Sequence, residues 1–483
     1  MGLALPWSAR RRATRATGAA AVMLLVACAC PPAGAQLLFG HPEYFPVGSL
    51  PTAIAAGDYN GDQVLDLVTS NYGSDNVSVL LGTGDGSFGV ASFYSIDARP
   101  HAVAAGDLNG DQILDLAVTH GGTTGRVSVL RGAGNGSFDE RTSFLVGVDP
   151  SEVDVADVNC DLRPDLVVAN RGSADVAVLL GSGDGTFAPA AFYAAGSMPI
   201  DVGVGDLNGD HTADLVTTVS NDDRVGVLLG NGDGTFGLPS FFHVGDQPGY
   251  VAVGDLDQDH ILDLAVTNLD SDDICVLLGL GDGAFQPATF YPAGNGPCGI
   301  AIVDLYSDGV QDLVFANQYW DDVTVYLGNG NGTFGAPHYY PAGNGPRDLV
   351  AGDFNGDGVV DLAVADALGD CVAILLGTLD PTTAFESPRP VSTSLIRSIA
   401  PDPVMDRAAI DFALDSPARV RLTLLDAGGR VVGALLDQDH PSGASRMTWD
   451  LMRATTHPIP AGTYFLRLDA AGRSGVRRIA IVH

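Results

Sequence analysis

Oxygen-bearing side chains recur at close spacing in the stretch from Gly352 to Leu362, which reads Gly-Asp-Phe-Asn-Gly-Asp-Gly-Val-Val-Asp-Leu. With Asp353 as position 1, carboxylates or an amide stand at positions 1, 3, 5 and 9, and position 7 offers a backbone carbonyl. Hard cations such as Ca²⁺ take about six to eight oxygen ligands. Gly356, at position 4, allows a sharp turn because glycine has no Cβ. This spacing predicts a calcium-binding loop.

The loop occurs seven times, in steps of 49 or 50 residues. The first positions are Asp58, Asp107, Asp157, Asp206, Asp255, Asp304 and Asp353. The ninth positions are Asp66, Asp115, Asp165, Asp214, Asp263, Asp312 and Asp361. The alternative is a set of metal-free aspartate-rich turns, but converging carboxylates without a cation would repel one another. A flexible cage of protein oxygens favours Ca²⁺ over Mg²⁺, with a dissociation constant of about 10⁻⁴–10⁻³ M.

Each repeat is predicted to form four short strands. In the first repeat these are Ala53–Ala56, Asp66–Thr69, Val77–Leu81 and Ser92–Tyr94. Four strands per unit of about 40–50 residues indicates a β-propeller blade, with a solenoid as the alternative.

The two ends of the repeat array are complementary. The seventh unit loses its glycine-rich turn after the strand Val372–Leu376, and the N-terminal part offers an unmatched strand within Phe39–Val47. Pairing of the two would leave the ring without an open edge. We therefore predict an all-β chain containing a seven-bladed β-propeller over residues 36–388.

A second motif, Gly-x-Gly-Asp-Gly-Thr-Phe-Gly at Gly230–Gly237, alternates with the loops. Together the two motifs resemble the FG-GAP/VCBS repeat family, whose members include the propeller of integrin α-subunits, over about residues 39–386. The resemblance implies that each loop joins the first and second strands of a blade and that up to seven Ca²⁺ ions bind on one face. The implied side-chain ligands are Asp58, Asn60, Asp62 and Asp66; Asp107, Asn109, Asp111 and Asp115; Asp157, Asn159, Asp161 and Asp165; Asp206, Asn208, Asp210 and Asp214; Asp255, Asp257, Asp259 and Asp263; Asp304, Asp308 and Asp312; and Asp353, Asn355, Asp357 and Asp361. In the sixth loop Tyr306 replaces a chelating side chain, so we expect that site to be weak.

The charge of the chain is divided unevenly. The net charge is −34, and residues 36–388 hold 8 arginines against 49 acidic residues, whereas residues 389–483 hold 12 arginines against 9. Such an acidic body repels phosphate backbones and argues against nucleic-acid binding. Nearly half of its acidic residues stand at ligand positions of the loops.

The N-terminal residues 1–35 have the pattern of an export signal. Four arginines precede the apolar stretch Ala19–Ala29, and Ala33-Gly34-Ala35 matches a cleavage site. An alternative is a lipoprotein anchored through Cys28. No other apolar run is long enough for a transmembrane helix. We expect a protein that is secreted or held at the outer cell surface.

Four further cysteines, Cys160, Cys275, Cys298 and Cys371, do not recur at fixed repeat positions. This pattern favours small buried residues over a disulfide framework or metal cluster. A Cys275–Cys298 bridge is the alternative.

Residues 391–483 alternate apolar and polar residues, as in Ile410–Leu414, Val420–Leu425 and Tyr464–Leu468, which predicts a small immunoglobulin-like β-sandwich. The motifs at Pro401–Pro403, Leu425–Val432 and Pro460–Phe465 resemble those of hook-capping-type immunoglobulin-like domains and of type IX secretion sorting domains. The resemblance implies export or surface attachment through a secretion apparatus. The alternative is an accessory sandwich without a sorting role.

The sequence lacks a Gly-x-Ser-x-Gly elbow, a phosphate loop, an HExxH motif and a Cys-x-x-Cys motif. This absence favours a binding or adhesion protein for an extracellular protein or glycan, without catalysis of its own. The alternatives are a carbohydrate-active lyase or hydrolase that uses the central channel, and a structural component of the envelope.

Overall fold

The computed structural model describes residues 36–97, 99–121 and 124–380, and, nearer the C-terminus, residues 396–400, 407–414, 418–426, 431–440, 443–450, 462–470 and 473–481. Within these residues the chain is all β apart from one 3₁₀ turn, η2 (Ser220–Asp222). The chain separates into two compact units, Met1–Ala384 and Phe385–His483. The predicted signal peptide with Cys28, and the predicted boundary between residues 388 and 391, lie outside the described residues.

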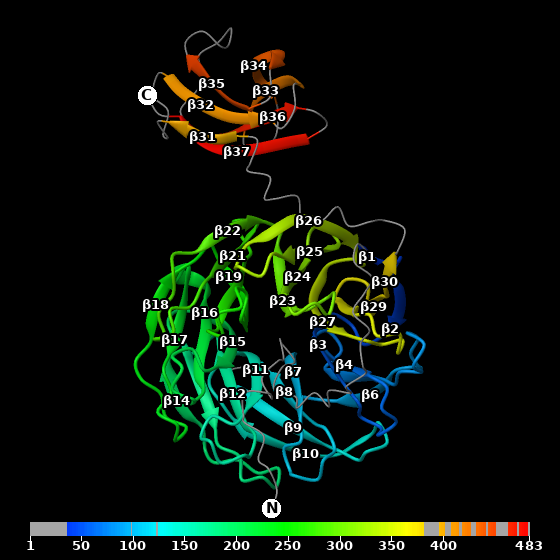
Figure 1. Ribbon diagram of the computed structural model, residues 1–483. Coiled ribbons are helices and arrows are strands. Elements are labelled where there is room, and N and C mark those ends of the chain that lie inside the picture. The colour runs from blue at the N-terminus through cyan, green and yellow to red at the C-terminus, as the bar shows by residue number, and fades with distance from the viewer. Residues whose placement is uncertain are drawn as a thin grey trace, which may run out of the picture. The chain divides into compact units, whose positions relative to one another are not determined.

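The described part of the first unit forms seven four-stranded antiparallel sheets around a common centre (Figure 1). The innermost strands are β3 (Pro51–Gly57), β7 (Pro100–Gly106), β11 (Pro150–Ala156), β15 (Pro199–Gly205), β19 (Pro248–Gly254), β23 (Pro297–Val303) and β27 (Pro346–Gly352). The second strands are β4 (Asp66–Asn71), β8 (Asp115–His120), β12 (Asp165–Asn170), β16 (Asp214–Val219), β20 (Asp263–Asn268), β24 (Asp312–Asn317) and β28 (Asp361–Asp366). The third strands are β5 (Asn76–Leu80), β9 (Arg126–Gly132), β13 (Asp175–Leu179), β17 (Arg224–Leu228), β21 (Asp273–Leu277), β25 (Asp322–Gly328) and β29 (Cys371–Leu375). The outermost strands are β6 (Ser92–Ser95), β10 (Phe138–Leu145), β14 (Ala191–Ala194), β18 (Ser240–His243), β22 (Thr289–Pro292), β26 (Phe334–Pro341) and β2 (Glu43–Pro46).

The sheets, numbered here from first (β3–β6) to seventh (β27, β28, β29 and β2), form a closed ring. Each innermost strand contacts the innermost strands of both neighbouring sheets, and β27 contacts β3. Repeated four-stranded sheets arranged in this way are consistent with a β-propeller.

Burial explains the composition of the strands. Every residue of the seven second strands is buried, because both faces of each sheet pack against its neighbours. The core therefore lies between sheets: Ile54 and Leu67 of the first sheet belong to one cluster with Phe354 and Ile374 of the seventh. The sequences of such strands are nearly continuous apolar runs and do not alternate between apolar and polar residues.

The N-terminal segment closes the ring in two places. As predicted, an N-terminal strand, β2, pairs with β29 and completes the seventh sheet. The prediction of one strand within Phe39–Val47 was wrong in detail, since β1 (Gln36–Phe39) pairs separately with β30 (Gly377–Asp380).

The division between β1 and β2 follows from the repeat itself. Phe39 pairs with Gly377 as Phe88 bridges Gly82 in the first sheet. The Gly40 N–H donates to the Leu376 carbonyl at 3.0 Å, as the Gly89 N–H donates to Leu81 at 2.8 Å. Phe39-Gly40 thus supplies the Phe-Gly half of the turn that the seventh repeat lacks.

Edge-to-face aromatic pairs join neighbouring sheets at the same place in each repeat. An outermost-strand ring meets the Phe of the glycine-rich turn in the next sheet. These pairs are Phe45–Phe88, Tyr94–Phe138, Phe144–Phe187, Tyr193–Phe236, Phe242–Phe285 and Tyr291–Phe334. At the seventh junction the ring of Phe39 meets Tyr340, with centroids 5.2 Å apart.

The described part of the second unit contains two antiparallel sheets. One consists of β31 (Ile396–Ala400), β32 (Arg407–Leu414) and β35 (Gly443–Asp450). The other consists of β34 (Val431–His440), β33 (Ala418–Asp426), β36 (Gly462–Ala470) and β37 (Arg473–Ile481). Buried residues of both sheets, among them Ile410, Trp449, Leu422 and Leu466, share one hydrophobic core. The motif residues Pro401–Pro403 and Gly428–Arg430 lie outside the described residues.

Candidate metal centres

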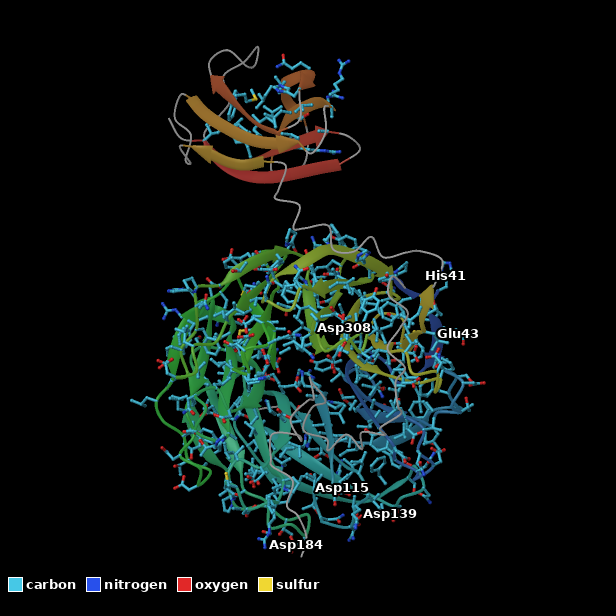
Figure 2. The ribbon with its side chains drawn as sticks, viewed as in Figure 1. His41, Glu43, Asp115, Asp139, Asp184 and Asp308 are labelled. Atoms are coloured by element: carbon cyan, nitrogen blue, oxygen red, sulfur yellow. The ribbon has the colours of Figure 1, made fainter. Side chains whose placement is uncertain are left out.

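All the predicted ligand residues lie in the seven connections between an innermost strand and a second strand, or at the first residue of that second strand. Position 1 follows directly after the innermost strand, and position 9 is the first residue of the second strand. Figure 2 shows Asp115, from the second sheet, and Asp308, from the sixth loop, well apart around the ring.

Hydrogen bonds within each loop fold it around the carboxylate at position 1. In the first loop the Asp58 carboxylate accepts the backbone N–H groups of Gly61, Asp62 and Gln63 at 2.7–3.2 Å. The N–H of position 6 makes this bond in all seven loops. The N–H of position 7 likewise donates to the carboxylate of position 5 in all seven. The loop conformation is therefore the same in every repeat.

The aspartate at position 9 has a second role, which the sequence did not reveal. Asp66 is buried, and its Oδ2 accepts the N–H of Tyr59 at 2.9 Å while its Oδ1 accepts the N–H of Gly82 at 2.8 Å. Equivalent pairs of bonds occur in the other six sheets. The carboxylate thus links the loop to the end of the third strand. A Cβ at Gly82 would collide with the Leu65 carbonyl oxygen, which explains the glycine there.

Burial makes these position 9 carboxyls hard to ionise without a cation. It raises the pKa of Asp66, Asp115, Asp165 and Asp361 to about 6, and that of Asp263 and Asp312 to about 7. The two backbone N–H donors oppose this rise, and the nearby aspartates of the same loop add to it. A bound cation would reverse the balance by favouring the ionised form.

The fifth loop fits a cation best. Carboxylate oxygens of Asp255, Asp257 and Asp263 lie within 4.8 Å of one another, the one such acidic group of three among the described residues. The Oδ1 of Asp255 is buried without a hydrogen-bond partner. In the other six loops the N–H of position 5 donates to the carboxylate of position 1, whereas in the fifth loop the N–H of Asp259 donates only to Asp257, at 3.3 Å. A buried, unpartnered carboxylate oxygen facing two further carboxylates is the donor set that a hard cation requires.

The sixth loop keeps the loop hydrogen bonds but changes the side chain at position 3. Asp304 accepts the N–H groups of Asp308 and Gly309 at 3.0 and 2.8 Å. Tyr306 packs instead against the hydrophobic cluster that contains Phe39. The substitution thus stands next to the place where β1 replaces the missing turn.

Five of the seven loops are also attached to the following sheet through position 2. The carbonyl of Tyr59 accepts the N–H of Gly136, which lies in the glycine-rich turn of the second sheet, at 2.9 Å. Leu108, Leu207, Leu256 and Phe354 make the same bond to Gly185, Gly283, Gly332 and Gly86. The last of these crosses from the seventh sheet to the first. A loop that is made rigid therefore also fixes the junction between two sheets.

The cysteines and loop histidines have no part in a metal centre of another kind. Cys275, Cys298 and Cys371 are buried and Cys160 is exposed, and all four are free thiols, so the alternative of a Cys275–Cys298 bridge was wrong. His211 and His260, at position 6, are 83% and 92% exposed, with Nδ1 at 3.7 and 3.5 Å from the position 1 carboxylate.

Four segments of the chain match the FG-GAP-like repeat family: residues 58–118, 157–217, 255–315 and 304–364. Each begins at position 1 of one loop and ends just beyond position 9 of the next, so the matches include all seven loops. The ring carries FG-GAP-like repeats. No curated protein matches the chain.

Solved structures share the architecture at low sequence identity. The BBS1N chain in complex with ARL6DN has a TM-score of 0.52 and 16% identity, and the match covers 72% of this chain and 99% of that one. This likeness shows the fold alone. The inactive virginiamycin B lyase of Staphylococcus aureus with quinupristin has a TM-score of 0.46 and 12% identity, over 71% and 99% of the two chains. The periplasmic gluconolactonase of Pseudomonas aeruginosa has a TM-score of 0.44 and 17% identity, over 62% and 87%.

Among the described residues, no helix has the length and apolar character needed to cross a membrane.

Proposed function

We propose that this protein is a secreted or surface-held, calcium-binding β-propeller of seven blades that binds an extracellular glycan or protein. The observation that carries the proposal is the sevenfold loop, whose carboxylates lie at one end of the sheets and whose backbone is hydrogen-bonded to the next sheet in five of the seven repeats. In this proposal Ca²⁺ is held by the aspartates and asparagines of positions 1, 3, 5 and 9, and neutralises carboxylates that otherwise repel one another. The ions stabilise the loops and the junctions between sheets, and the opposite end of the ring is available to bind the glycan or protein ligand.

A screen of immobilised glycans and extracellular proteins, with Ca²⁺ and with EDTA, tests the binding role. We expect capture that depends on Ca²⁺, because the ions fix the junctions between sheets. Release or turnover of a polysaccharide, with no stable capture, would instead support the alternative of an enzyme that acts at the channel. If the protein neither captures a ligand nor acts on a polysaccharide, the result would favour the alternative of a structural component of the envelope.

For the second unit we propose an immunoglobulin-like sandwich that directs export or surface attachment. Its support is the pair of sheets around a single core, together with the motifs at Leu425–Val432 and Pro460–Phe465. Deletion of residues 391–483 should leave the protein inside the cell envelope, as fractionation and immunoblotting would show. Unchanged export of the shortened chain would contradict the sorting role.

A further inference from the structure

Two exposed aromatic side chains lie against each other in the sixth sheet. Trp320 belongs to the hairpin between β24 and β25 and is 55% exposed, and Tyr339 belongs to the outermost strand β26 and is 46% exposed. The centroids of their rings are 6.2 Å apart and the ring planes are inclined at 58°. Among the described residues this is the one close aromatic pair in which both rings are exposed.

The repeat shows that the pair is specific to this sheet. Five other sheets also carry an exposed ring at the place of Tyr339: Tyr44, Phe93, Phe192, Phe241 and Phe290. At the place of Trp320 those sheets have small or polar residues, respectively Gly369, Ser74, Ser173, Asp222 and Ser271. Single exposed rings are ordinary on a protein surface, whereas contiguous ones mark a place where another molecule binds.

The tryptophan replaces a residue that stabilises other sheets. In four sheets the side chain at this place accepts the backbone N–H of the residue two before the innermost strand's proline, at 2.9–3.3 Å. The acceptors are Ser74, Ser173, Asp222 and Ser271. Trp320 cannot accept such a bond, because an indole N–H is only a donor. Departures of this kind from a repeated structural device are where a functional site is expected.

The backbone holds the Trp320 hairpin in place. The Gln318 N–H donates to the Gly296 carbonyl at 2.9 Å, and the Tyr319 N–H donates to the Asn295 carbonyl at 3.1 Å. A Cβ on Gly296 would lie 2.5 Å from the Tyr319 ring, so the glycine lets the hairpin lie against the segment that leads into β23. A hairpin held in this way lowers the cost of ordering when a ligand binds.

The charges around the pair exclude an anionic ligand. Residues 36–388 hold 8 arginines against 49 acidic residues, and such a body repels anions. Carboxylates also lie next to the pair. Asp321 follows Trp320, and its Oδ1 accepts the Gly345 N–H at 2.8 Å. Burial and the carboxylate of Asp322 raise the pKa of Tyr339.

The exposure of the pair favours an uncharged ligand over a cation. A cation over half-exposed rings stays hydrated and gains little. A flat apolar ligand would instead remove the surface of both rings from water. Pyranose rings whose hydroxyls are equatorial present flat faces of C–H groups, and their hydroxyls can donate to carboxylates. The pair therefore suits a sugar ring.

We propose that Trp320 and Tyr339 form a subsite for an uncharged polysaccharide of β-linked pyranose rings with equatorial hydroxyls. The inference rests on the proposed binding function, and it names the ligand class and the place of binding. The hairpin follows the last residue of β24, whose first residue, Asp312, belongs to the sixth metal loop. The subsite thus lies at the end of the sheet opposite the candidate metal centres.

Titration of the mature chain in Ca²⁺ with cellotetraose and chitotetraose tests this inference, by calorimetry and by acrylamide quenching of tryptophan fluorescence. Quenching reports on Trp320, because Trp449 is 2% exposed and Trp7 belongs to the predicted export signal. We expect at least one of the two probes to bind and to protect Trp320 from the quencher. The anionic trigalacturonate and the cationic trilysine should bind at least about tenfold more weakly.

Trp320→Ala and Tyr339→Ala should each weaken binding at least about tenfold, because the sugar ring loses apolar surface that it would cover. Trp320→Phe keeps a ring and should retain part of the affinity. The matched control is Phe192→Ala, since Phe192 is 53% exposed at the same place in β14 and has Ser173 where Tyr339 has Trp320. It should leave the affinity unchanged. Melting curves of all variants separate a loss of binding from a loss of folding.

The inference is overturned if neither probe binds, if trigalacturonate or trilysine binds as tightly, or if Trp320 is not protected from the quencher. It is also overturned if Phe192→Ala weakens binding as much as Trp320→Ala. Calcium-dependent capture of another ligand, without binding of either probe, would refute the ligand class and leave the proposed function standing. Failure of the screen to capture any glycan or protein would instead contradict the proposed function.

Discussion

At the scale of single residues, the aspartate at position 9 does more than its place in the loop suggests. Asp66 and its six counterparts accept one N–H from within the loop and one from the end of the third strand. Each therefore stabilises its sheet whether or not a cation is bound. The aspartates at positions 1 and 5 bond within the loop, apart from the ion pair between Asp111 and Arg131. Without a cation they therefore stabilise mainly the loop conformation.

This difference predicts that two changes in the same loop have different effects. Asp66→Ala leaves two buried N–H groups without acceptors and should lower the free energy of unfolding by about 2–4 kcal/mol, both in Ca²⁺ and in EDTA. Asp62→Ala, at the exposed position 5, should remove stability mainly in Ca²⁺. Chemical denaturation of both variants in both solutions measures the two effects. Equal losses by Asp62→Ala in Ca²⁺ and in EDTA would contradict its role as a ligand.

The position 9 carboxyls also predict how stability varies with pH. Their folded pKa, about 6 to 7 where burial raises it most, lies above the value of 3.8 for an ordinary aspartate, so the folded state holds the proton more tightly. Without metal, stability should therefore fall as the pH rises from about 4 to about 7, and be greater near pH 5 than near pH 8. With Ca²⁺, which requires ionised carboxylates, the stabilisation should grow over the same range.

Melting curves near pH 5 and pH 8, in EDTA and in Ca²⁺, check this prediction. If the metal-free protein were more stable near pH 8 than near pH 5, the position 9 carboxyls would not be the groups that control the pH dependence of its stability.

At the scale of structural elements, the N-terminal segment supplies the outermost strand of the seventh sheet and the Phe-Gly part of its turn. The sequence signal was present, because Phe39-Gly40 stands as far before Phe45 as Phe88-Gly89 stands before Tyr94. It was hidden because the segment has neither the Gly-Asp-Gly that precedes Phe88 nor a preceding strand of its own. Only the pairing of Phe39 with Gly377, far along the chain, shows what it replaces.

Phe39→Ala tests this closure. The buried ring contacts Tyr340 and the cluster around Tyr306, so we expect a loss of about 3–4 kcal/mol in the free energy of unfolding. Phe93→Ala is the matched control, since Phe93 lies on an outermost strand and is 55% exposed. Denaturant titration should show a small effect for the control. Similar losses in the two variants would argue against the closure.

The sixth loop joins the closure to the metal centres. Tyr306 belongs to the cluster around Phe39, which explains why position 3 carries no ligand there. Tyr306→Asn should raise the number of bound Ca²⁺ ions by one and lower stability in EDTA, because the ring leaves the cluster. Calcium counting by mass spectrometry of the intact protein, beside a melt in EDTA, measures both. An unchanged ion count would show that Tyr306 does not control the site.

At the scale of the whole molecule, regular spacing made most of the fold predictable. The steps between Asp58 and Asp353 led to repeated four-stranded sheets, and the strands near Asp66 and Val77 lie close to their predicted bounds. The hydrogen bond between Gly82 and Asp66 could not be predicted, because the loop spacing alone already accounts for the Asp66 carboxylate as a metal ligand.

The metal loops lie at one end of the innermost strands and influence the junctions between the sheets. Backbone bonds such as Gly136 to Tyr59 pass the rigidity of a loop on to the next sheet, and the bond from Gly86 to Phe354 passes it across the closure. Occupied loops would therefore hold the whole ring, including the end where we place the ligand. Ligand binding and the stability of the ring should then respond together to the removal of calcium.

Bound calcium is expected to stabilise the folded ring. A thermal melt of the mature protein in Ca²⁺, Mg²⁺ and EDTA tests this expectation most directly. At about 10 mM Ca²⁺ and a dissociation constant of about 10⁻³ M, each occupied site contributes about 1.4 kcal/mol. We expect the melting temperature to be clearly higher in Ca²⁺ than in EDTA, with little effect of Mg²⁺. Identical melting in Ca²⁺ and EDTA would contradict the account.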